Sequence, residues 1–151
     1  MERTENVKIV KYILRFGLFY LLALVVIAII TTLLKINSNS SSMASVILAT
    51  MMTSLKFIND NKRVPNASEK AKLVWYSFTA TWIVSFVLVL LFLSISGELG
   101  TIIELLSKVS FGLVFGIVLF VSALEILLLY FGYGWLANKQ YEGLVKKGKI
   151  S

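Results

Sequence analysis

The sequence predicts an all-α integral membrane protein, with four transmembrane helices in one domain over residues 1–151 and both termini in the cytoplasm. Three observations predict this fold: an apolar composition, four long stretches almost free of charge, and an uneven distribution of Lys and Arg. Hydrophobic residues make up 58% of the chain and charged residues 15%. With a mean hydropathy of +0.85, the composition lies well outside the usual range of soluble domains.

The four predicted spans follow one another with polar connections. Residues 16–34 form an uncharged run, long enough to cross a hydrocarbon core of about 30 Å as a helix. A polar turn at 37–42 precedes a shorter second span at 43–58, which is rich in Ser, Thr, Ala and Met; a re-entrant segment is the alternative there. Residues 73–96 and 109–137 form the third and fourth spans, and both are long enough to cross with some tilt.

Residues 59–72 form the most polar stretch and are predicted to be a cytoplasmic loop. This stretch contains Pro65, the one proline in the sequence, which stops a helix from continuing backwards through it. Asn66 and Glu69 are spaced as the two members of a reciprocal capping box, so we expect a helix to begin just after Asn66.

The positions of Lys and Arg predict the orientation, because positive charges near span ends are retained in the cytoplasm. Thirteen of the fifteen lie in the N-terminal segment, around the middle loop or in the C-terminal tail, and Lys35 and Lys108 are the exceptions. Both termini and residues 59–72 are therefore predicted to be cytoplasmic, which requires an even number of spans and favours a full crossing by 43–58. Six aromatic residues would then lie near the inner interface: Tyr12, Trp75, Tyr76, Tyr133, Trp135 and Tyr141.

Composition also argues against several function classes. The chain has no cysteine and no histidine, so it lacks a thiolate nucleophile and the commonest metal ligand. No phosphate-binding loop, nucleophile elbow or metal-ligand cluster is recognisable, and we expect neither an enzyme, a cofactor nor a metal site. The net charge of +7 is split among three groups flanking the spans, which favours anionic lipid headgroups over nucleic acid.

Glu125 is the main candidate functional residue. It lies sixteen residues after Val109 and thirteen before Asn138, hence near mid-membrane. A carboxylate there costs several kcal/mol unless it is paired, hydrated or protonated, so its default interpretation is functional. It could bind a proton or a cation in a carrier, or it could simply fasten helices together by a hydrogen bond.

Helical spacing suggests partners for this carboxylate. Thr81 and Ser85 share one face of the third span, and Thr50 and Ser54 share a face of the second. With Glu125 they form a predicted polar seam, which would line either a small hydrated substrate and proton site or a tight interhelical contact.

Two pairs of glycines are predicted to serve packing. Gly112 and Gly116 form a GxxxG motif that permits close helix approach and could be a subunit contact. Gly132 and Gly134 allow a local irregularity or a close backbone contact; a hinge is the alternative.

Three stretches carry a resemblance to a known group of proteins: YILRFGLFY at 12–20, KFINDNKRVPNASEKAKLVWYSF at 56–78 and FGYGWLANKQ at 131–140. The chain resembles a family of small inner-membrane proteins from Acinetobacter and related bacteria. The resemblance implies a four-helix membrane fold, a homo-oligomer, with a trimer as the expected state, and a role in the cell envelope or in tolerance to toxic compounds. It implies no substrate and no catalytic residues.

The leading hypothesis is a transporter or envelope-protective protein of the bacterial inner membrane that confers tolerance to toxic amphipathic compounds or antibiotics, with Glu125 as its proton or cation site. Small multidrug carriers also have four spans and a membrane glutamate, but theirs lies in the first span, which contains no acid here. The alternative is a non-transporting structural or regulatory protein that supports an envelope complex. An intramembrane enzyme would need a nucleophile–base pair or a metal site, and neither is visible.

Overall fold

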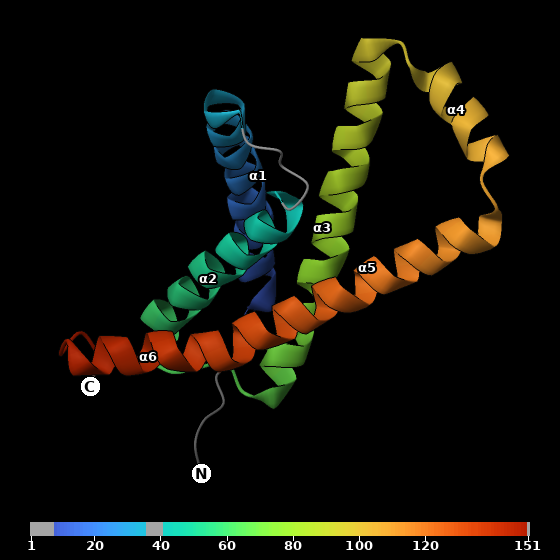
Figure 1. The fold of residues 1–151 in the computed structure, drawn as a ribbon. Helices are drawn as coiled ribbons and strands as arrows, with labels where there is room; N and C mark the ends of the chain where they lie inside the picture. The colour runs from blue at the N-terminus through green and yellow to red at the C-terminus, as the bar shows by residue number, and fades with distance from the viewer. Residues whose placement is uncertain (1–7, 36–40, 151) are drawn as a thin grey trace.

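The chain folds into helices joined by short connections (Figure 1). A computed structural model describes residues 8–35 and 41–150, and these residues contain no β-strand. The helices are α1 (Ile9–Leu34), α2 (Ser41–Asn61), α3 (Ala67–Ser96), α4 (Leu99–Lys108), α5 (Phe111–Phe131), the π-helical turn η1 (Gly132–Leu136) and α6 (Ala137–Lys146). Arg3 and residues 37–40 of the predicted polar turn lie outside the described residues.

Four helical segments are long and apolar enough to cross a membrane, which confirms the number of long apolar helices predicted. They are Ile9–Leu34, Ser42–Asn61, Ala67–Ser96 and Phe111–Lys146. The first three contain the predicted spans whole, and the last contains all but the first two residues of 109–137. The connection between α2 and α3 is shorter than the loop predicted at 59–72, because α2 continues to Asn61 and α3 begins at Ala67.

The start of α3 is fixed by the predicted capping box. The backbone N–H of Glu69 donates to Asn66 Oδ1, and the backbone N–H of Asn66 donates to Glu69 Oε2, both at 2.9 Å. Arg63 adds two bonds to the same carboxylate, at 2.6 and 2.8 Å. Two unsatisfied donors of the first turn are therefore paired, and the guanidinium holds the loop against the helix.

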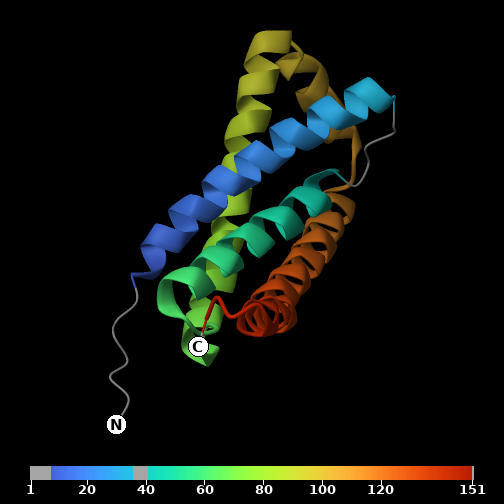
Figure 2. The same ribbon diagram turned by 90° about the vertical axis from the view of Figure 1, so that its left-hand side faces the viewer.

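The helices pack closely at one end of the molecule, which we call the packed end. There the beginning of α1, the end of α2 and the beginning of α3 lie together with η1 and α6 (Figures 1 and 2). The buried cluster at this end draws on α1, α2, α3, α5 and η1: Tyr12, Phe16, Tyr20, Val46, Ala49, Phe57, Leu73, Val74, Leu129 and Tyr133. The connection that contains Lys62 and Arg63 lies at this end, as does α6 with its lysines.

The opposite part of the molecule is an open arch, formed by residues 86–120. It consists of the second half of α3, all of α4 and the first half of α5 (Figure 1). Large apolar side chains on the arch are mostly exposed; Phe92, Phe111 and Phe120 are examples. An apolar surface of this extent marks a region that another apolar phase or partner covers.

A close helix contact joins η1 to α2 at Gly132. A Cβ atom placed on Gly132 would overlap the side chain of Thr50 on α2. Gly132 also begins η1, where the wider π-helical turn interrupts the α-helical rod of α5 and α6. The predicted irregularity therefore includes both glycines, and the predicted close contact is at Gly132, where η1 lies against α2.

Candidate functional site

Glu125 lies on α5, half-buried, where that helix faces α3. Its Oε1 atom is buried and has no hydrogen-bond partner among the residues that the structure describes. Thr81 of α3 lies close enough to interact with the carboxyl group, while its hydroxyl donates to Ser77 O at 3.0 Å. The other side chains that line this region are uncharged, so the carboxyl group retains unused capacity for a ligand or a proton.

The carboxyl group opens into a cavity of about 190 Å³. All four long apolar helices contribute to its wall, because residues of α1, α2, α3 and α5 line it. The polar lining residues are Tyr20, Ser42, Thr81, Ser85 and Glu125, and the apolar ones are Met43, Val46, Trp82, Val121 and Leu128. A single carboxyl group among aromatic and aliphatic side chains is a suitable environment for an organic cation with an apolar body.

Neither a protein-family model, nor a curated protein, nor a solved structure matches the chain.

Tyr20 and Ser85 form a polar bridge across the cavity wall. The Tyr20 hydroxyl and Ser85 Oγ lie 3.1 Å apart, and the tyrosine side chain is buried. The contact joins α1 to α3 beside Glu125. Ser85 was predicted as part of the site, and its hydroxyl is already engaged by Tyr20 of α1, which was not predicted as a site residue.

The predicted polar seam divides into two groups. Thr81, Ser85 and Glu125 line the same cavity, whereas Thr50 and Ser54 do not. The Thr50 hydroxyl donates to the backbone oxygen of Val46 at 2.7 Å, within its own helix. Ser54 is buried, and its Oγ has no hydrogen-bond partner among the described residues. Thr50 thus belongs to the helix contact at Gly132 and not to the cavity.

A second buried polar contact lies at the packed end. The hydroxyl groups of Tyr133 in η1 and Ser77 in α3 are 2.9 Å apart, and both residues are buried. Tyr133 was expected near the inner interface with five other aromatic residues. Trp75, Tyr76 and Trp135 are exposed, but Tyr133 points into the helix packing.

The GxxxG motif lies on the arch, away from the cavity. No described atom outside the neighbouring backbone lies within 4 Å of a Cβ atom placed on Gly116, and only Ser110 approaches one placed on Gly112. Within this chain the motif therefore packs against nothing described, and its role as a subunit contact stays a prediction.

Proposed function

We propose that this chain is a multi-pass protein of the bacterial inner membrane that binds and exports amphipathic cationic compounds through the Glu125 cavity. The observation that supports the proposal most is a half-buried carboxyl group with an unpartnered buried oxygen, in a cavity lined by all four long apolar helices. An ionisable residue inside apolar helices is expensive to maintain and marks ion or substrate pathways in membrane proteins.

The proposed chemistry is competition at one carboxyl group. Ionised Glu125 binds either a proton or an organic cation, and each displaces the other. Trp82 and Tyr20 contribute aromatic rings to the cavity wall, which suits the apolar body of the compound. Binding of a proton from the outer side would then release the cation there, so that tolerance depends on the proton gradient.

The proposed orientation places both termini in the cytoplasm. It is supported by the gathering of the Lys- and Arg-rich segments at the packed end, on α1, around the α2–α3 connection and on α6. Positive charges of this kind are retained on the cytoplasmic side and favour anionic headgroups.

The proposal is tested by complementing a deletion strain and measuring its susceptibility to cationic dyes, detergents and antibiotics. The strain receives wild type, Glu125→Gln, Glu125→Ala or Glu98→Gln at matched membrane levels; Glu98 is exposed and lies outside the cavity. We expect wild type and Glu98→Gln to restore tolerance and both Glu125 variants to fail. Purified wild type should bind a cationic dye more weakly as pH falls, and Glu125→Gln should lose that dependence.

The second candidate function is a non-transporting protein that supports an envelope complex as a homo-oligomer, with a trimer as the proposed state. It is favoured by the uncovered glycine face on α5 and the exposed apolar arch around it. Full restoration of tolerance by Glu125→Gln would contradict the carrier proposal and leave this candidate in its place.

A further inference from the structure

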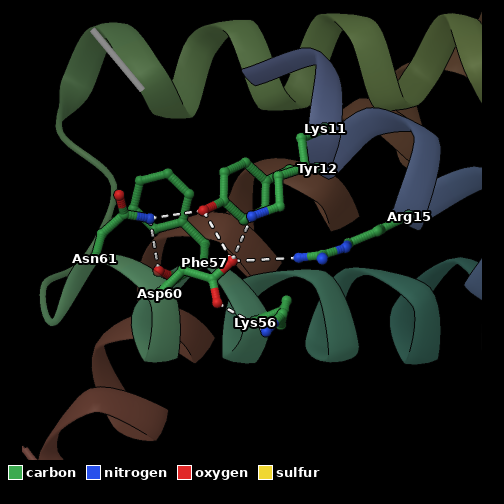
Figure 3. Close-up of polar contacts among 7 residues, drawn as sticks. All are labelled: Lys11, Tyr12, Arg15, Lys56, Phe57, Asp60 and Asn61. Atoms are coloured by element: carbon green, nitrogen blue, oxygen red, sulfur yellow. Dashed lines mark hydrogen bonds and ion pairs between the residues drawn. The ribbon is translucent and has the colours of Figure 1, made fainter. Parts of the chain in front are cut away.

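A cluster of charged residues joins α1 to α2 at the packed end (Figure 3). One carboxylate, Asp60, meets three cations. Its Oδ2 atom is 3.2 Å from Lys11 Nζ and 3.2 Å from Arg15 Nη1. Its Oδ1 atom is 2.7 Å from Lys56 Nζ. Among the described residues the cluster therefore has an excess of two positive charges.

Neutral groups fix the geometry of this cluster. The Tyr12 hydroxyl donates to Asp60 Oδ2 at 3.3 Å, and Asn61 Nδ2 donates to the same hydroxyl at 2.9 Å. The ring of Tyr12 packs on Phe57, with centroids 5.0 Å apart. The carboxylate is thus held by the hydroxyl of a tyrosine whose ring is packed on Phe57. The three cationic side chains remain 33–53% exposed.

Apolar ridges lead away from the cations along both helices. On α1, Leu18 and Leu22 follow Arg15 at helical spacing and are exposed. On α2, Leu48 and Met52 precede Lys56 at intervals of four residues and are also exposed. A ligand with a negative head and an apolar tail would meet cations at one end and these ridges along its length.

We propose that this cluster binds the phosphate of an anionic phospholipid, with an acyl chain lying along the α1–α2 surface. Arg15 and the two lysines together present more N–H donors than one carboxylate accepts, and guanidinium and ammonium groups are the usual partners of phosphate. The adjacent ridges favour a lipid over a free phosphate ion. The site is separate from the Glu125 cavity and does not depend on transport, although it does depend on the proposed membrane insertion.

The test measures lipid binding to the purified full-length protein by native mass spectrometry from detergent, with phosphatidylglycerol and phosphatidylcholine as probes. We expect phosphatidylglycerol to bind wild type more tightly. Lys11→Gln/Arg15→Gln should weaken the binding of phosphatidylglycerol by about fivefold for each cation removed. The same double variant should leave the binding of phosphatidylcholine unchanged. Lys146→Gln/Lys147→Gln removes the same charge from α6 and its end and should leave both affinities unchanged. Asp60→Asn removes the competing anion and should preserve or strengthen the preference.

Two further measurements keep the outcome decisive. Circular dichroism shows whether the double variant still forms its helices. If it does not, Lys56→Gln replaces it, because this variant keeps the contacts of Lys11 and Arg15 with Asp60. We then expect a single loss of about fivefold in phosphatidylglycerol affinity. An excess of inorganic phosphate should not displace phosphatidylglycerol. Equal affinities for the two lipids, equal effects of the two double variants, or displacement by inorganic phosphate would each overturn the lipid site. None of these results bears on Glu125, whose proposed role is tested separately by the susceptibility of the complemented deletion strain.

Discussion

The packed end and the arch contain similar apolar residues but differ in how far they bury them. At the packed end Phe16, Phe57 and Leu73 are fully buried against other helices. On the arch Phe86, Phe111 and other large side chains face outwards. Because apolar side chains gain little from leaving one apolar phase for another, exposure on the arch costs nothing where lipid or detergent covers it.

Polar contacts between helices are likewise concentrated away from the arch. The described side-chain bonds between distant helices include Tyr20–Ser85, Ser77–Tyr133 and the cluster around Asp60, and they join α1, α2, α3 and η1. On the arch the described ion pair is Lys108–Glu104, within one helix. Specific packing and polar contacts therefore define the helix arrangement at the packed end, whereas most large apolar side chains of the arch are exposed.

The largest expected effect is a loss in the free energy of unfolding, and it should differ between one phenylalanine of the packed end and one of the arch. Phe57 is 0% exposed and Phe115 is 54% exposed. We expect Phe57→Ala to lower the free energy of unfolding by about 3 kcal/mol, because it leaves a cavity between helices. We expect Phe115→Ala to change it by less than about 0.5 kcal/mol, since detergent covers that ring before and after unfolding. Denaturant titration in mild detergent, followed by circular dichroism, measures both. Equal losses would mean that the arch is as specifically packed as the other end.

The next largest effect compares a glycine in a close contact with a glycine in open space. Gly132→Ala should lower the free energy of unfolding by about 2 kcal/mol, because the new methyl group overlaps Thr50. Gly116→Ala introduces the same methyl group into open space on the arch and should be neutral or stabilise the helix by up to about 1 kcal/mol. The same titration measures both variants.

Adding Thr50→Ser to Gly132→Ala should recover part of the loss, because it removes the overlapping methyl group and keeps the hydroxyl that bonds to Val46. Failure of this rescue would show that the glycine is needed for the π-helical turn itself and not for the contact.

Local patterns in the sequence were sufficient to predict the four long helices and the start of α3, but not every element of the fold. Uncharged runs predicted four long apolar helices, and the spacing of Asn66 and Glu69 predicted the start of α3 within one residue. These features depend on neighbours a few positions apart. Helix α4 was not predicted, because a ten-residue amphipathic segment contains no long uncharged run. The apolar residues at 102, 103, 105 and 106 are nevertheless spaced as on one face of a helix.

The arrangement of the sites could be predicted only in part. Helical periodicity shows which residues share a face, so Thr81 and Ser85 were placed together correctly. It does not show which helix that face meets, so the two alternatives for the seam, a hydrated site or a tight interhelical contact, could not be separated for Thr50, which packs on Gly132. The cluster at Asp60 brings together residues 45 to 49 positions apart, and no local pattern indicates such a contact.

The smallest expected effect tests the buried hydroxyl pair. Tyr133→Phe removes the bond to Ser77 and should cost about 1 kcal/mol, because the remaining hydroxyl is buried without its partner. Tyr130→Phe makes the same change on an exposed ring two residues outside η1 and should cost nothing measurable. The double variant Tyr133→Phe/Ser77→Ala should lose less stability than the sum of the two single variants, since both changes remove the same bond. Strict additivity would show that these hydroxyl groups act independently, and that α3 is held against η1 by apolar packing alone.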